Sequence, residues 1–151
     1  MKYLFFSVLL VFLSCKGQEK SAGNGEESMD NDRLQLVESD DYSGSDTEEF
    51  LVISDIKTLQ KFYLTVNKTR KPGLPIPEID FTKELLVVYC AGKQQDSSRP
   101  KVFIENETSE NLILGVEKKE SEKINTAITT PFSVYKLPLT GKKIILQEQS
   151  E

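Results

Sequence analysis

The chain has 151 residues and a formal net charge of −5, with 19 lysine and arginine side chains against 24 aspartate and glutamate side chains. A net negative charge opposes binding to the phosphate backbone of nucleic acid. The absence of histidine excludes Ser-His-Asp and Cys-His nucleophiles and zinc sites with imidazole ligands. Carboxylate pairs and a Ser-Lys arrangement stay possible, but no motif indicates either of them. We therefore expect a protein that is not an enzyme, that holds no cofactor and no metal, and that does not bind nucleic acid.

The chain begins with Lys2, an apolar run from Tyr3 to Leu13, and then Ser14-Cys15. A positive residue, a short apolar core and a small residue before the cleavage point are typical of a secretory signal, and a cysteine directly after that point supplies a thiol for lipid attachment. The run is shorter than the about 20 apolar residues that a membrane-spanning helix needs. This pattern predicts a lipoprotein signal peptide. An ordinary cleaved signal and an unprocessed anchor are the alternatives.

The mature chain is then expected to begin at Cys15, with diacylglycerol on its sulfur and a further acyl chain such as palmitate on its amine. Two or more acyl chains hold a protein stably at a membrane, whereas one does not. Lys16, and not an aspartate, follows the cysteine. By analogy with lipoprotein sorting, this favours the outer membrane.

The composition predicts four segments: a signal peptide over 1–14, the lipidated Cys15 with a disordered tether over 15–32, one domain over 33–148, and a short tail over 149–151. The tether is expected because it contains almost no large apolar side chain. With Cys15 lipidated, Cys90 is the one cysteine left, so no disulfide within the chain is expected. The stability of the domain must then come from packing.

The first half of the domain contains patterns for two strands and one helix. Leu34 and Leu36 alternate with polar neighbours and predict a strand over 33–38, and Phe50–Ile53 predicts a second. Ser54 is expected to be the N-cap of a helix over about 55–67. The stripe that this helix is expected to bury consists of Ile56, Leu59, Phe62 or Tyr63, and Val66.

The second half is read as an extended connector followed by further strands. Three prolines over 72–77 exclude a helix, so this segment is expected to lie across the edge of the core, with docking onto a partner as the alternative. The continuous apolar run Leu85–Cys90 predicts a central strand covered on both faces, with a buried Cys90 thiol. A hairpin is expected over 101–117, a charged solvated loop over 118–123, and strands over 132–137 and 143–147. The predicted fold class is α+β: a mainly antiparallel, curled sheet of about six to seven strands with one packed helix.

Several blocks of this sequence stand in a recognisable order between about residues 50 and 146. They are Phe50–Ile53 with the helix after it, Ile79-Asp80-Phe81, Leu85–Tyr89 leading into Ala91-Gly92-Lys93, and the run from Thr130-Pro131-Phe132 to Lys136-Leu137-Pro138. In order and spacing they resemble the PrcB C-terminal domain family. Residues 94–100 stand where family members often carry a Gly-Gly pair, and Tyr42-Ser43-Gly44 loosely matches a Tyr-Gly element near the start of the family. The resemblance implies a small, non-catalytic domain, named after an accessory subunit of a surface protease complex.

Residues of these blocks are expected to have structural roles: Asp80, Phe81, Pro131, Phe132, Lys136 and Pro138. The Asp80 carboxylate is expected to cap a turn, and Phe81 to fill the core. Lys136 is expected to point from the strand face opposite Tyr135 and Leu137, because side chains alternate along a strand.

Two functions remain open at this point. The leading hypothesis is a non-enzymatic envelope lipoprotein that binds or stabilises another envelope protein, such as a surface protease, while a lipid anchor holds it at the membrane. The alternative is a lipoprotein that binds a small ligand or an ion. Carboxylates suited to calcium stand at Asp40, Asp41, Asp46, Glu48 and Glu49, but their spacing fits no EF-hand. A solvated acidic turn is therefore the preferred interpretation of that stretch.

Overall fold

The computed structural model describes residues 31–95, 98–117 and 127–147. The predicted signal, Cys15, most of the predicted tether, the run 118–123 and the tail lie outside these residues. The elements in chain order are η1 (Asn31–Arg33, a 3-10 turn), β1 (Gln35–Asp40), β2 (Glu48–Ile53), α1 (Ile56–Val66), β3 (Glu84–Ala91), β4 (Lys101–Glu107), β5 (Asn111–Glu117), β6 (Phe132–Pro138) and β7 (Lys143–Leu146). Within the described residues, no helix combines the length and the apolar character that crossing a membrane would require.

The strands form two sheets. The four-stranded sheet has the order β1-β6-β3-β2 and is antiparallel throughout. The three-stranded sheet has the order β4-β5-β7, with β4 antiparallel and β7 parallel to β5. The predicted α+β class, with seven mainly antiparallel strands and one packed helix, is confirmed. The strands do not form one curled sheet, however, because neither sheet is curled or closed.

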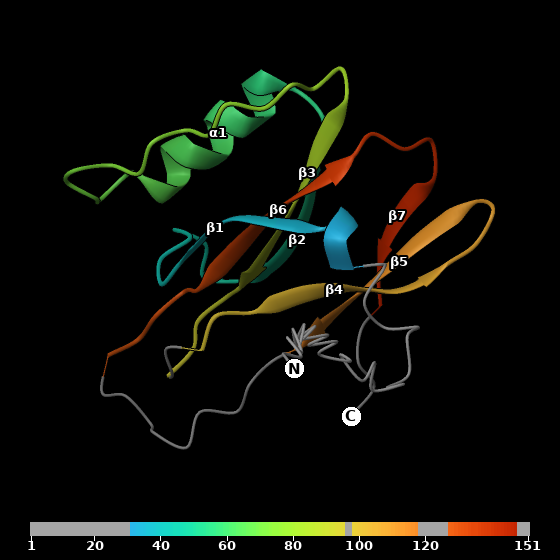
Figure 1. The fold of residues 1–151 in the computed structure, drawn as a ribbon. Coiled ribbons are helices and arrows are strands. Elements are labelled where there is room, and N and C mark those ends of the chain that lie inside the picture. Colours follow the sequence, from blue (N-terminus) through green and yellow to red (C-terminus); the bar gives the residue numbers. More distant parts are fainter. Residues whose placement is uncertain (1–30, 96–97, 118–126, 148–151) are drawn as a thin grey trace, which may run out of the picture.

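The reason for two sheets is the central strand β3, whose residues from Leu85 to Ala91 are all buried. A strand with apolar side chains on both faces needs a covering layer on each side. In Figure 1, α1 covers one face of the four-stranded sheet, and β4, β5 and β7 lie on the other side. The result is three layers with a core on each side of the four-stranded sheet, as predicted for Leu85–Cys90.

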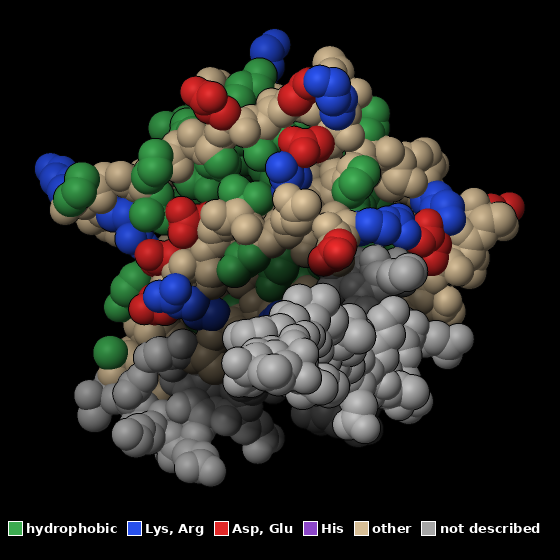
Figure 2. Space-filling view, in the orientation of Figure 1, with side chains coloured by type: hydrophobic (Ala, Val, Ile, Leu, Met, Phe, Trp, Pro, Cys, Tyr) green, Lys and Arg blue, Asp and Glu red, His purple; other side chains and the backbone are tan. Residues whose placement is uncertain are grey.

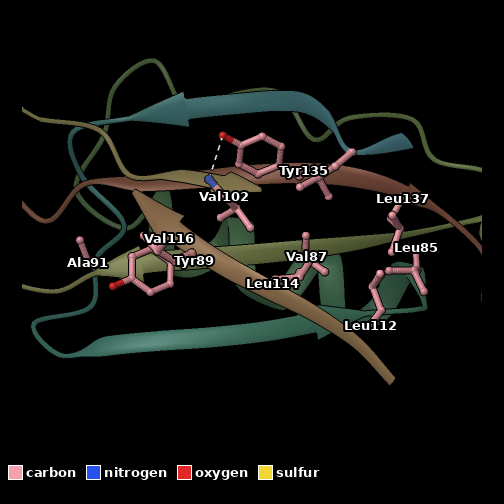
Figure 3. Packing of buried hydrophobic residues seen from close by; sticks show 11 residues of the cluster. Leu85, Val87, Tyr89, Ala91, Val102, Leu112, Leu114, Val116, Tyr135 and Leu137 are labelled. Atoms are coloured by element: carbon pink, nitrogen blue, oxygen red, sulfur yellow. Dashed lines mark hydrogen bonds between the residues drawn. The ribbon is translucent and has the colours of Figure 1, made fainter. Parts of the chain in front are cut away.

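The core between the two sheets brings β3 and β6 against β4 and β5. Its buried members include Leu85, Val87, Tyr89, Val102, Leu112, Leu114, Val116, Tyr135 and Leu137. Figure 3 shows Val87 beside Leu114 in the middle of this core. The Val102 N–H donates a hydrogen bond of 3.2 Å to the Tyr135 hydroxyl. The Tyr135 hydroxyl thus has a hydrogen-bond partner inside this core.

The helix packs on the opposite face through Leu59, Phe62, Tyr63 and Val66. Ile56 was expected in this stripe, but it is 48% exposed. Phe62 and Tyr63 are both buried, so the buried stripe is wide enough to include both of them. Ile56 lies at the margin of this stripe.

The N-cap is Asp55 and not Ser54. The Asp55 carboxylate accepts backbone hydrogen bonds from Lys57 (2.9 Å) and Thr58 (3.0 Å). The helix begins at Ile56, one residue later than predicted, and a carboxylate at this position also stabilises the positive end of the helix dipole.

The proline-containing segment after α1 is extended and lies beside the helix (Figure 1). The Asn67 amide holds it by donating to the Leu74 carbonyl (2.9 Å) and accepting from the Leu74 N–H (2.7 Å). Leu74, Ile79 and Phe81 pack against the core under the helix, and hydrophobic side chains gather on this part of the surface in Figure 2. The prediction that this segment lies across the edge of the core is confirmed.

Three charged residues fasten the start of the domain to the three-stranded sheet. The Glu107 carboxylate lies 2.6 Å from the Arg33 guanidinium and 2.6 Å from the Lys142 ammonium. These contacts join η1, the end of β4 and the turn before β7. The hydrogen bond from Arg33, followed by that from Lys142, lowers the pKa of Glu107 to about 2.

The Glu107→Gln variant is expected to have a free energy of unfolding about 1 kcal/mol lower at neutral pH, because solvent screens a partly exposed ion pair. The folded pKa of Glu107 is depressed, so its contribution is complete above the ordinary value of 4.5 and is lost as the pH falls towards 2. Urea denaturation at several pH values measures the difference in the free energy of unfolding between the wild-type chain and the variant. A difference that stays constant down to pH 2 would contradict the role given to the Glu107 carboxylate. Glu117→Gln is the control, because the Glu117 carboxylate lies 3.9 Å from Lys101 at the surface.

Candidate functional site

Connecting segments from distant parts of the sequence meet at one end of the four-stranded sheet. They are residues 41–46 between β1 and β2, residues 92–95 after β3, and residues 128–131 before β6; together we call them the loop platform. Ser43 N–H donates to the Thr130 carbonyl at 2.7 Å, and Gln94 and Thr129 exchange two backbone hydrogen bonds at 2.9 and 3.0 Å. The three segments are therefore linked by backbone hydrogen bonds, as strands are.

The buried polar side chains of the described residues gather at this end. They are Ser43, Thr129, Thr130 and Ser133. The Thr130 hydroxyl accepts from the Ser43 N–H (3.1 Å), and the Ser133 hydroxyl donates to the Pro100 carbonyl (2.6 Å). Buried polar groups with satisfied hydrogen bonds fix the conformation of the loops around them. The loop platform is thus a preorganised part of the domain.

Glycines with positive φ make this close packing possible. Gly44 has a φ of 78° and Gly92 a φ of 68°. A Cβ atom on Gly44 would lie 2.7 Å from the Thr65 carbonyl oxygen in the last turn of α1. The 41–46 segment therefore rests directly on the helix. The Arg70 guanidinium reinforces this contact through paired hydrogen bonds to the Asp40 carboxylate.

The outer surface of the loop platform combines two apolar side chains with paired charges. Tyr42 is 50% exposed and Ile128 is 56% exposed. Tyr42 bridges to Thr130, two residues after Ile128. The Asp41 carboxylate lies 3.0 Å from the Arg99 guanidinium, and Asp46 lies 2.8 Å from the Lys93 ammonium. The Glu49 carboxylate adds a further negative charge beside the 41–46 segment, where it accepts a hydrogen bond of 2.9 Å from the Ser45 hydroxyl.

The chain enters the domain at the end opposite the loop platform. In the pairing of β1 with β6, Gln35 lies opposite Lys136, and Asp40 lies opposite Phe132. β1 therefore runs from the end that carries η1 to the end that carries the loop platform. In Figure 1, η1 lies towards the right and the connection between β1 and β2 lies at the left. A strand of this length separates the two ends by about 20 Å.

The residues expected to have structural roles do not form one cluster. The Asp80 carboxylate accepts from the Thr82 N–H (3.1 Å) and lies 2.7 Å from the Lys83 ammonium, and the hydrogen bond from Lys83 lowers the pKa of Asp80. Asp80 thus closes the turn before β3. Phe81 is half-buried against the core under the helix.

The remaining four residues belong to β6 and the residue before it. The Pro131 carbonyl accepts from the Ala91 N–H (2.8 Å), and Phe132 is fully buried. The Lys136 ammonium lies 3.0 Å from the Glu84 carboxylate, on the face opposite Tyr135 and Leu137. Pro138 is the exposed last residue of the strand. Of this set, only Pro131 lies in the loop platform, and Phe132 directly follows it.

Cys90 is 1% exposed, as predicted. Burial raises the pKa of its thiol to about 12, opposed by a hydrogen bond with Ser43. A thiol that stays protonated and has no access to solvent reacts slowly. We expect a thiol reagent such as dithionitrobenzoate to label Cys90 only when urea unfolds the chain. Prompt labelling of the folded Cys15→Ser chain would contradict this burial.

The acidic stretch does not converge on one point. Asp40, Asp41 and Asp46 each pair with a different cation, namely Arg70, Arg99 and Lys93. Across residues 31–95, 98–117 and 127–147, no group of three metal-ligating side chains is arranged to hold a metal ion. These carboxylates act in the structure as partners of basic side chains that brace the loop platform.

Comparisons of this chain with protein-family models, with curated proteins and with solved structures find no match. The geometry alone therefore defines the candidate site. Sequence patterns did not reveal that Thr130 and Arg99 contact the 41–46 segment. The blocks that carry the resemblance include Tyr42-Ser43-Gly44, Gly92-Lys93 and Thr130-Pro131, all at this end of the domain, but no local pattern indicates that these segments meet.

Proposed function

We propose that this chain is a non-enzymatic lipoprotein of the outer membrane whose domain binds another envelope protein, in the manner of a protease-complex accessory subunit. The observation that carries this proposal is the start of the sequence: Lys2, the apolar run to Leu13, and Ser14 before Cys15. Lipid on Cys15 would make the membrane the permanent location of the domain.

The geometry of the domain supports a role in binding. The residues before Asn31 join the domain at η1, and the loop platform lies at the other end of β1. A domain held at η1 by a tether can therefore turn its loop platform away from the lipid. The blocks that resemble the PrcB C-terminal domain family add to this proposal, since the resemblance implies a partner and not a reaction.

Affinity purification from gently crosslinked membranes tests the proposed function. We expect one defined envelope protein to copurify with the wild-type chain, and much less of it to copurify with the Cys15→Ser chain, which lacks the lipid anchor. The lipid anchor raises the local concentration of both proteins, so its loss weakens even an unchanged contact. Recovery of the bait alone from wild-type membranes would contradict the proposal.

A further inference from the structure

We infer that the solvent-exposed side of α1 and the turn after it form a basic surface that rests on anionic lipid of the membrane that holds this protein. Its members are exposed side chains on the helix and in that turn, and we call them the basic helix face: Lys57, Lys61, Leu64, Lys68 and Lys71. This inference rests on the proposed function, because lipid on Cys15 would bring the domain to a membrane. It adds to that proposal the face of the domain that meets the lipid.

Charge is divided unevenly along this chain. The stretch 56–77, which comprises α1 and most of the extended segment after it, contains five basic residues and no acidic residue. All 24 acidic residues therefore lie outside it, and they give the protein its net negative charge. A local basic surface still attracts anionic lipid on such a protein, because salt screens exposed charges that are more than about 8 Å apart.

The lysines of the basic helix face have no ionic partner in the domain. Arg70, the fifth basic residue of the stretch, pairs with Asp40. Among the residues that the structure describes, no carboxylate forms an ion pair with any of the four lysines. The turn after α1 projects at the left of Figure 1, and Figure 2 shows lysine or arginine side chains on this projection. The four ammonium groups are therefore available to lipid phosphates.

An exposed leucine lies among these lysines. Leu64 is 73% exposed, the highest value among the large apolar side chains of the described residues. It lies three residues after Lys61 and seven after Lys57, which is the spacing of side chains on one face of a helix. Since the opposite stripe of α1 is buried against the core, this face points to solvent. A leucine with basic neighbours suits the boundary between lipid headgroups and acyl chains.

The proposed anchor favours a membrane over an acidic protein as the occupant. Fifteen residues separate Cys15 from Asn31, and a chain of this length reaches at most about 50 Å. Lipid on Cys15 would thus keep headgroups at a high local concentration around the domain. Because α1 covers a face of the four-stranded sheet and the loop platform lies at one of its ends, contact through α1 leaves the loop platform uncovered.

Fluorescence quenching in vesicles tests this inference with the full-length lipidated chain. The fluorophore nitrobenzoxadiazole is attached through Gln60→Cys, one turn before Leu64, or through Ser109→Cys, in the exposed turn between β4 and β5. Cys90 is buried and the Cys15 sulfur carries lipid, so the introduced thiol is the one that reacts. In vesicles with about 30% phosphatidylglycerol, we expect doxyl-labelled lipid to quench the label at position 60 about threefold more than the label at position 109.

A matched pair of variants tests the role of the basic charges. Lys61→Gln combined with Lys68→Gln should remove most of the excess quenching at position 60. Lys101→Gln combined with Lys143→Gln should leave it unchanged, because it removes the same charge from exposed positions of the three-stranded sheet. Phosphatidylcholine in place of phosphatidylglycerol, or NaCl at about 0.5 M, should act as the first variant does.

A lipidated chain with equal quenching at positions 60 and 109 in anionic vesicles would overturn this inference and leave the proposed function standing. An acidic protein as the true occupant would give that result, because the vesicles contain no other protein. An excess at position 60 that persists in phosphatidylcholine vesicles would also overturn the inference, since charge would then not select the lipid. A wild-type chain purified from membranes without lipid would overturn the proposed function and this inference with it.

Discussion

Replacing Phe132 by alanine is expected to lower the free energy of unfolding by about 4 kcal/mol, the usual cost of removing a fully buried aromatic side chain. Phe132 is 0% exposed and starts β6 at the point where that strand passes beneath α1. Its ring meets the Phe62 ring edge to face, with 5.5 Å between the centroids. The substitution would thus open a cavity between the helix and the four-stranded sheet.

Urea denaturation of the Cys15→Ser chain, followed by circular dichroism, measures this loss without interference from lipid. Phe81→Ala is the matched control, because Phe81 packs against the same core but is only half-buried. Its loss should be about 1 to 2 kcal/mol, in proportion to the smaller area removed from water. Equal losses for the two variants would show that the depth of burial assigned to Phe132 is wrong.

Replacing Gly44 by alanine is expected to lower the free energy of unfolding by about 2 to 3 kcal/mol. Gly44 has a φ of 78°. At such a positive φ, a residue other than glycine is less stable by about 1 kcal/mol or more. The new methyl group would also meet the Thr65 carbonyl oxygen at 2.7 Å, so the 41–46 segment or the end of α1 would have to move.

Gly141→Ala provides the control for this prediction. Gly141 has no atom within 4 Å of the position that its Cβ would take, so the substitution should change stability by less than about 0.5 kcal/mol. The measurement is again the urea midpoint of the Cys15→Ser chain. If Gly44→Ala were as mild as Gly141→Ala, the contact between the loop platform and the helix would not exist as described.

Local patterns predicted the elements of this fold well, because each pattern depends on neighbours in sequence. The run Leu85–Cys90 indicated a strand with two buried faces, and β3 has them. The alternation over 101–117 indicated a hairpin, and β4 and β5 form it. Sequence does not distinguish Ser54 from Asp55 as the N-cap of α1, because serine and aspartate favour that position about equally; the structure shows Asp55 there.

The arrangement of the elements was harder to predict, because alternation shows which face of a strand is apolar and not which strand lies beside it. The division into two sheets and the parallel pairing of β7 with β5 depend on such distant contacts. So does the loop platform, in which Ser43 and Thr130 are 87 residues apart. Arg33 and Glu107, which fasten the start of the domain, are 74 residues apart. No local pattern predicts contacts at these separations.

Lipid modification of Cys15 determines both the proposed location and the proposed mode of action of this protein. The decisive measurement is the intact mass of the mature chain purified from membranes, with the Cys15→Ser chain as the reference. We predict a chain that begins at residue 15 and carries the mass of a diacylglycerol and one further acyl group, and a Cys15→Ser chain without that mass. A wild-type chain that carries no lipid mass would contradict the account.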